Sequence, residues 1–298
     1  MSGPRSRRTT TFLACLALAA GLAGCSDDTG GDPGGDPDRL VVTPVTDGST
    51  TGLSPRGDGN RASVAGYTIE DVRLPKAGRT GEVSFRVVDK AGKAVTDYTP
   101  EQTKLLHLYV VRDDLGEFRH VHPELGDDGT WRGRVDLGGP GWWRVVAEFI
   151  PAGADRPVVL GTSLRVAGPW RAAVVPVGDA AATGDDGVVQ VRLMAHGEVG
   201  SNGRLRVSVT TPQGEPLQLG SYLGATAHLT GFAVGTGGFV HVHPLGAPEV
   251  TDEGTVLTFH TAFTDPGDYR LFVQLRVDGL LHQVAVTATV DAGESPEE

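Results

Sequence analysis

Cysteine is almost missing from this chain, because its 298 residues contain only Cys15 and Cys25. Everything after Cys25 therefore lacks a thiol, which excludes disulfide bonds, a catalytic cysteine and thiolate metal ligands. A blue-copper centre is excluded as well, since it requires a cysteine. Methionine is equally scarce, and after Met1 only Met194 remains, so a methionine-rich Cu(I) site is also excluded.

The sequence also lacks the short motifs of common enzyme classes. It contains no nucleophile elbow, phosphate loop, zinc-protease helix or dinucleotide-binding fingerprint. The neighbouring carboxylates Asp113–Asp114 and Asp127–Asp128 lie in expected turns, and nothing beyond their abundance marks them as a catalytic pair. We therefore expect a protein that binds and does not catalyse.

The first residues differ in composition from the rest of the chain. A basic stretch, "MSGPRSRR", precedes an apolar one, "TTTFLACLALAAGLAG", and "LAGC" ends at Cys25. This order matches the lipobox of bacterial lipoprotein signal peptides. The match implies a signal peptide at residues 1–24, lipidation of Cys25 and anchoring to the cell membrane on its extracytoplasmic side. An ordinary secretory signal is the alternative. Downstream, no apolar run reaches the roughly eighteen residues of a membrane span.

The chain has fewer basic than acidic residues, 26 against 37, which gives a net charge of −11. Loss of residues 1–24 would remove three arginines and no acid, which takes the balance to −14. An acidic body argues against nucleic acid or anionic lipid headgroups as partners. It suits a cationic partner or simple solubility.

Residues 25–60 and the tail at 293–298 are rich in small and polar residues and have few apolar anchors. Such segments cannot bury enough surface to offset the entropy of ordering, so we expect both to be disordered. The longer one is a flexible linker that would hold the folded part away from the membrane.

The body between these segments reads as an all-β protein. Short runs of β-branched and aromatic residues recur about every 8 to 12 residues, a pattern typical of sandwiches. The body is also duplicated, because "LHLYVVRDDLGEFRHVHP" aligns without gaps with "AHLTGFAVGTGGFVHVHP". We predict two tandem Ig-like antiparallel β-sandwich domains, at residues 61–168 and 169–292.

Histidines recur at matching positions of the two halves. His120 and His122 lie one residue apart on an expected strand and therefore share a face. A hairpin closed around Asp113–Gly116 would place His107 opposite His122 and Tyr109 opposite His120. Three imidazoles would then lie close enough to converge on one ion.

The same reasoning gathers His228, His241 and His243 in the second half, with Phe232 opposite Phe239. His260 and His282 lie on strands that could approach this second cluster, which makes it the stronger metal candidate. Nitrogen ligands at this spacing suit Cu(II) or Zn(II), and we expect copper ahead of zinc.

Carboxylates near the first cluster are further candidates. Glu124 follows "HVHP" and Glu148 lies in "VVAEF", so either is able to supply an oxygen ligand or orient an imidazole. Solvent-exposed acids that take no part in the site are the simpler interpretation of both residues.

Two non-metal interpretations stay open. The imidazoles are able to form a hydrogen-bonded network inside the sandwich, packed against aromatic side chains, namely Trp131, Trp142, Trp143 and Phe149. They are also able to form a face that responds to pH or binds a partner, since histidine titrates near neutrality. In either case the chain would be an Ig-like interaction module that docks another protein of the cell envelope.

Two of the segments with these residues carry a resemblance to a known group. "HLYVVRDDLGEFRHVHP" and "PGWWRVVAEF" resemble segments of actinobacterial exported lipoproteins with Ig-like sandwiches, which are distantly similar to sandwich domains associated with copper and heavy-metal handling. The resemblance covers residues 64–167 and, more loosely, 170–291. It implies an exported sandwich and carries over no catalytic residue. This chain departs from related copper-binding sandwiches, which often use an amino-terminal histidine.

Overall fold

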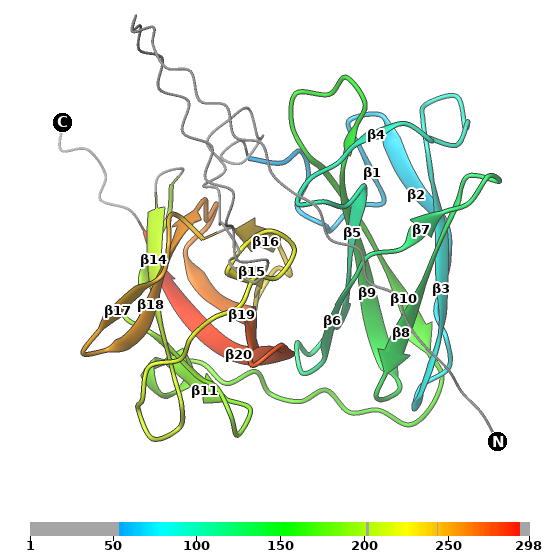
Figure 1. Ribbon diagram of the computed structural model, residues 1–298. Helices are drawn as coiled ribbons and strands as arrows, with labels where there is room; N and C mark the ends of the chain where they lie inside the picture. The colour runs from blue at the N-terminus through cyan, green and yellow to red at the C-terminus, as the bar shows by residue number, and fades with distance from the viewer. Residues whose placement is uncertain (1–53, 201–202, 243, 293–298) are drawn as a thin grey trace, which may run out of the picture. The chain divides into compact units, whose positions relative to one another are not determined.

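The computed structural model describes residues 54–200, 203–242 and 244–292 (Figure 1). The expected signal peptide, the lipid site Cys25, most of the linker, His243 and the tail at 293–298 lie outside the described residues. Both sandwiches fall within one compact unit of the chain. In the described ranges no helix is both long and apolar enough to cross a membrane.

The first sandwich has two five-stranded sheets. One contains, in spatial order, β1 (Ser63–Val64), β2 (Tyr67–Arg73), β3 (Arg79–Val88), β8 (Thr130–Leu137) and β7 (Glu124–Leu125). The other contains β10 (Val158–Val166), β9 (Gly141–Pro151), β5 (Leu106–Arg112) and β6 (Phe118–Val121), with the short β4 (Tyr98–Thr99) beside β9.

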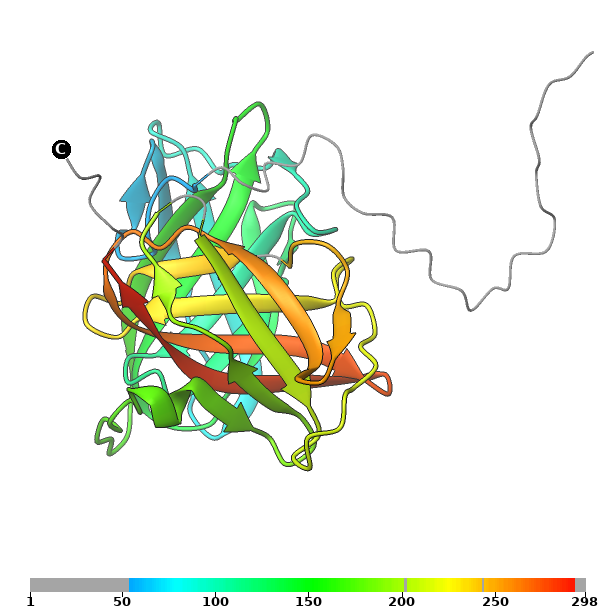
Figure 2. The same cartoon turned by 90° about the vertical axis from the view of Figure 1, so that its left-hand side faces the viewer.

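The second sandwich, which faces the viewer in Figure 2, repeats this arrangement after a 3-10 turn, η1 (Asp179–Ala182). One sheet contains β11 (Thr183–Asp185), β12 (Gln190–Leu193), β14 (Gly203–Thr210), β18 (Gly254–Thr261) and β17 (Glu249–Thr251). The other contains β13 (Gly197–Glu198), β20 (Leu280–Asp291), β19 (Gly267–Val277), β15 (Ala227–Ala233) and β16 (Phe239–Val242).

The order of the strands is that of an immunoglobulin domain, whose sheets contain strands A, B, E, D and C, F, G. In the first sandwich β2, β3, β8 and β7 form the first set, and β5, β9 and β10 form the second, with β6 added beside β5. The second sandwich repeats both sets. The first set is β12, β14, β18 and β17, and the second is β15, β19 and β20. The predicted fold class, two tandem Ig-like antiparallel sandwiches, is confirmed.

Residues just before the predicted boundary at residue 61 also contact the first sandwich. Arg56 forms a parallel bridge with Val158 on β10. Gly57 permits this close approach, because a Cβ there would lie 2.3 Å from the carbonyl oxygen of Val159. Between the sandwiches, β10 ends at Val166 and the next element begins at Asp179.

Each sandwich buries its own core between its two sheets. On β5 the residues Leu106, Leu108 and Val110 point into the first core, which also contains Trp131, Trp143 and Phe149. On β15 the residues Ala227, Leu229 and Ala233 point into the second core. Alternation along a strand sends the intervening residues to the outer face of the same sheet.

These outer faces are not exposed, because the two sandwiches bury them against each other. All residues from Leu106 to Val111 are buried. A third apolar cluster, here called the interdomain cluster, combines residues of both sandwiches: Tyr109, Val111, Leu115, Phe118, Val146, Val159, Phe232, Phe239 and Phe272. At its centre Phe118 stacks on Phe272 with ring centroids 4.4 Å apart.

The contact between Phe118 and Phe272 should couple the stabilities of the two sandwiches. Denaturant unfolding of Phe118→Leu, Phe272→Leu and the double variant should give a coupling energy of about 0.5–1.5 kcal/mol, as for other aromatic pairs. Phe118→Leu combined with Phe263→Leu is the control, because Phe263 lies in the second core. Additive effects for the first pair would show that the rings make no such contact in solution.

Candidate metal centre

The β5–β6 hairpin has the predicted register. Tyr109 lies opposite His120, and Val111 lies opposite Phe118. The loop between them is fixed by the side chain of Asp114, whose Oδ1 accepts from Arg112 Nε at 2.8 Å and from the amide of Gly116 at 3.1 Å. This register keeps His107 of β5 and His120 of β6 on one face, and His122 follows directly after the end of β6 at Val121.

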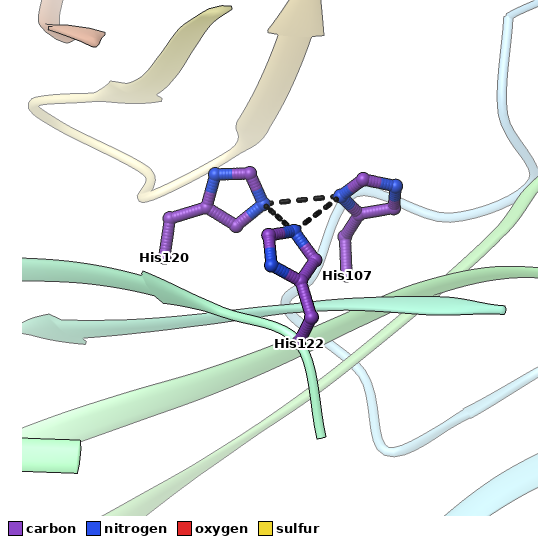
Figure 3. A group of neighbouring side chains, drawn as sticks. All are labelled: His107, His120 and His122. Atoms are coloured by element: carbon purple, nitrogen blue, oxygen red, sulfur yellow. Dashed lines mark hydrogen bonds between the residues drawn. The ribbon is translucent and has the colours of Figure 1, made fainter. Parts of the chain in front are cut away.

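Three ring nitrogens converge above this hairpin, as Figure 3 shows. His107 Nδ1 lies 3.0 Å from His120 Nε2, and His122 Nε2 lies 3.2 Å and 3.1 Å from these two atoms. We call this group the histidine triangle. Nitrogens around a tetrahedral zinc ion are separated by about 3.3 Å, given metal–nitrogen bonds of about 2.0–2.1 Å. The triangle therefore has nearly the dimensions of a metal site.

Hydrogen bonds on the far side of two rings fix their tautomers. His107 Nε2 lies 3.1 Å from the carbonyl oxygen of Glu101, so in a hydrogen bond this nitrogen carries the proton. His120 Nδ1 lies 2.9 Å from Gln274 Oε1 and must likewise donate. In the neutral rings the lone pairs of His107 Nδ1 and His120 Nε2 then both point into the triangle.

The triangle favours neutral imidazoles. Burial, with a further contribution from the neighbouring imidazoles, lowers the pKa of His107 to about 4 and that of His122 to about 3. The pKa of His120 is held well below its usual range, again mainly by burial. His107 and His120 are only 1% and 8% exposed, whereas His122 is partly exposed at one side of the group. Neutral nitrogens are the form that binds metal.

The histidines of the second sandwich lie beside the triangle. The ring of His241 lies 5.8 Å from that of His107, and the ring of His228 lies 6.0 Å from that of His120, measured between centroids. The cluster predicted in the first sandwich is present, and His228 and His241 of the second set face the same interface. His243, the third predicted ligand there, lies outside the described residues.

A buried carboxylate from the first sandwich binds an imidazole of the second. His241 Nδ1 lies 2.7 Å from Glu148 Oε2, and the hydroxyl of Tyr109 donates to the same oxygen at 2.9 Å. Burial would lower the pKa of His241, but the charge and hydrogen bond of Glu148 outweigh it and raise this pKa. Burial would raise the pKa of Glu148, but the charge of His241 holds it below its usual range. Glu148 thus orients an imidazole of the other sandwich, and the simpler interpretation of this residue as a solvent-exposed acid does not hold.

Two further metal candidates do not join the group. His282 Nδ1 bonds Asp186 Oδ2 at 2.8 Å. His260 lies on β18, in the sheet that does not contain β15 or β16. The period of a strand predicts which residues share its face, but it does not predict which strands share a sheet, so it did not place His260. His282 lies on β20, in the same sheet as β15 and β16, but opposite Leu275 of the second core. Glu124 is exposed at the start of β7.

The interpretation of the histidines as part of a tryptophan-lined core does not hold. Trp131, Trp143 and Phe149 lie in the first core, on the opposite face of the sheet from the triangle. Trp142 is 44% exposed. The histidines are buried, but between the sandwiches.

Sequence reasoning missed Gln274 as a partner of the site. The repeat contained the signal, because "VVAEF" aligns with "LFVQL" and places Gln274 at the position of Glu148. Both side chains contact a histidine of the opposite sandwich, Glu148 with His241 and Gln274 with His120. Similarly, His228 Nε2 bonds the carbonyl oxygen of Tyr222 at 2.9 Å, as His107 Nε2 bonds that of Glu101.

The family described as Domain of unknown function (DUF8832) matches residues 62–160 and 181–292. The chain belongs to this family. The two DUF8832 segments fall in the first and second sandwiches, respectively. No curated protein matches the sequence.

Several solved structures match three quarters or more of this chain at low sequence identity. They include the tetra-tandem repeat in the extending region of a large adhesion protein, with 14% identity, a TM-score of 0.24 and coverage of 76% of this chain and 50% of that one. InvD of Yersinia pseudotuberculosis has 12% identity, a TM-score of 0.22 and coverage of 75% and 57%. The FN1–FN3 domains of chicken CNTN1 have 12% identity, a TM-score of 0.21 and coverage of 80% and 67%. The chain thus spans about half the length of the first of these.

Removal of the Glu148 charge should lower the pKa of His241. In Glu148→Gln the amide still accepts a hydrogen bond, but the negative charge that opposes the effect of burial is lost. An NMR titration should therefore show the pKa of His241 falling below its ordinary value of 6.5. Glu124→Gln, which changes an exposed acid, should leave the titration unchanged. A His241 pKa that stays raised in Glu148→Gln would contradict the ion pair.

Acid should destabilise the metal-free protein through its buried histidines. Burial lowers the pKa of His228 to about 3 in the folded state. Below its unfolded pKa of about 6.5 only the unfolded chain takes up this proton, so stability falls by about 1.4 kcal/mol per pH unit as the pH decreases. Denaturant unfolding between about pH 6 and pH 4.5 should show a slope reduced by this amount in His228→Gln. Thr230→Val, on the same face of β15, should keep the wild-type slope.

Proposed function

We propose that the protein binds a divalent metal ion of the copper or zinc class through the histidine triangle. The observation that carries the proposal is the convergence of three ring nitrogens within 3.0–3.2 Å. The far-side partners of His107 and His120 turn two lone pairs towards each other, which is unfavourable without a proton or a cation between them. His122 is able to supply one proton at most, whereas a metal ion satisfies all three nitrogens.

The ligand chemistry limits the choice of metal. Imidazole nitrogens are good ligands for zinc, copper, iron and nickel. Magnesium and calcium prefer oxygen ligands, so a site made of three imidazoles disfavours them. Among divalent ions of this series Cu²⁺ binds nitrogen sites most tightly, which places copper ahead of zinc. Three ligands leave a coordination position for water or another group.

We propose a binding role and not a catalytic one. Two cavities among the described residues lie elsewhere: one is lined by residues around Asp179, Met194 and His196, the other by residues around Val199 and Phe263. Neither lining includes a residue of the triangle, and the interface with the second sandwich covers His107 and His120. The second sandwich thus covers two of the three ligands, and His122 lies at the partly exposed side of the group.

The expected anchoring of the protein to the membrane indicates where its metal site would lie. With lipidation at Cys25, the protein would present its metal site outside the cytoplasm, tethered to the membrane by the linker. In a body without thiols, imidazole and carboxylate groups are the ligands left for this class of metal, which suits the histidine triangle. The resemblance to exported lipoproteins and copper-handling sandwiches stays a prediction. So does a second ion at His228, His241 and His243.

Calorimetry tests the proposal directly. The purified protein should bind Cu(II) and Zn(II), and His122→Ala should weaken binding at the triangle at least about 100-fold, because it removes one of three ligands. His122 is the preferred change, since it is partly exposed and its truncation disturbs the fold less than truncation of His107. Co(II) absorption would give the coordination number of the same site.

His196→Ala is the matched control, because His196 is exposed and bonds Asp291 away from the triangle. An ion that survives His122→Ala would belong to the second set of histidines. Absence of binding to the wild-type protein would reject the metal proposal. The histidines would then be structural parts of an interaction module that docks an envelope protein.

A further inference from the structure

The histidine triangle is hydrogen-bonded to a side chain of the other sandwich. Gln274 of β19 is 3% exposed, and its Oε1 is the acceptor for His120 Nδ1 at 2.9 Å. Its amide nitrogen donates to Gln283 Oε1 at 3.0 Å, which fixes the orientation of the Gln274 amide. Gln283 in turn donates to the carbonyl oxygen of Phe118 at 3.3 Å. Two glutamines of the second sandwich thus hold the strand that carries His120.

The same strand is also held by packing. Phe118 lies two residues before His120, and Phe272 lies two residues before Gln274, so each stacked ring shares a sheet face with a member of the polar pair. Docking of the two sandwiches therefore sets the position and the tautomer of His120 together.

The repeat places a carboxylate at the equivalent position of the first sandwich, and the difference has a chemical consequence. Glu148 carries a negative charge that favours the protonated form of His241. Gln274 accepts the same kind of hydrogen bond without a charge, so His120 remains neutral with its Nε2 lone pair towards the triangle. The amide thus makes His120 a ligand, whereas the carboxylate makes His241 an ion-pair partner.

We infer that Gln274 is a positioning residue of the metal centre, so that metal binding in the first sandwich and docking of the second sandwich are thermodynamically linked. This inference rests on the proposed function. Partners beyond the ligands, such as Gln274, typically change metal affinity 10–100-fold. Linkage is reciprocal, so a metal that binds the docked form more tightly must oppose separation of the sandwiches by the same factor.

The first test compares Gln274→Leu with the wild-type protein in zinc calorimetry. The substitution removes the acceptor but keeps a similar volume, and the affinity of the triangle should fall about 10–100-fold. Gln190→Leu is the matched control, because Gln190 lies on β12 of the same sandwich and pairs with Thr210. A structural defect alone would leave the tautomer of His120 unchanged. Nitrogen NMR of the metal-free protein should instead show His120 moving from the Nδ1–H form towards the Nε2–H form in Gln274→Leu.

The second test measures docking through a buried thiol. Val111→Cys places a thiol in the interdomain cluster, where Val111 is 1% exposed, and Val83→Cys places one in the first core. Saturating zinc should slow iodoacetamide labelling at position 111 about 10–100-fold, with mass spectrometry of the peptides as readout. Labelling at position 83 reports unfolding and separates that process from opening of the interface.

The outcomes distinguish the two ideas. If the wild-type protein binds no zinc or copper, the proposed function fails and the linkage fails with it. If the wild-type protein binds metal and Gln274→Leu binds it equally well, only the inference about Gln274 is overturned. Zinc binding without any change in labelling at position 111 would likewise overturn the linkage and leave the metal site in place.

Discussion

The structure depends on the burial of one sheet, β10–β9–β5–β6, on both of its faces. One face covers the first core, and the other lies against the second sandwich in the interdomain cluster. A histidine on a solvated sheet face would keep a pKa near neutrality and a mobile ring. Here the second sandwich removes water from the imidazoles, which keeps them neutral, and supplies the acceptor that fixes one of them.

The sequence was sufficient to predict the β5–β6 hairpin, but it did not predict that the second sandwich covers the outer face of this hairpin. Strand alternation and the ungapped repeat predicted that His107, His120 and Tyr109 share a face, because the pleat leaves no other choice once the loop length is set. Strand alternation does not predict which part of the protein packs on that face. The run from Leu106 to Val111 did contain a signal, since a strand that is apolar at almost every position is typical of burial on both faces. The periodicity of one strand does not identify its neighbours, so it could not show that His260 lies in the other sheet, whereas His282 lies in the expected sheet but opposite Leu275 of the second core.

The duplication explains how the second face became buried. Equivalent sheets of the two sandwiches meet, and equivalent residues make crosswise contacts: Gln274 with His120, and Glu148 with His241. This is the pattern of an isologous dimer interface, in which residue i of one copy contacts residue j of the other and the reverse. Joined in a single chain, the two copies are free to differ. Their difference at one position, amide against carboxylate, gives the two crosswise contacts different charges.

That difference assigns different physical roles to the two contacts. A buried ion pair such as Glu148 with His241 gains little net stability, because desolvation of both charges offsets most of their attraction. Loss of one partner is nevertheless costly, so the pair acts against any arrangement of the sandwiches that would leave a charge alone in the interface. The contact between Gln274 and His120 is uncharged, so it needs no opposite charge in the interface. It leaves His120 Nε2 available as a metal ligand. One crosswise contact thus specifies how the sandwiches meet, and the other uses that fixed geometry to present a nitrogen ligand.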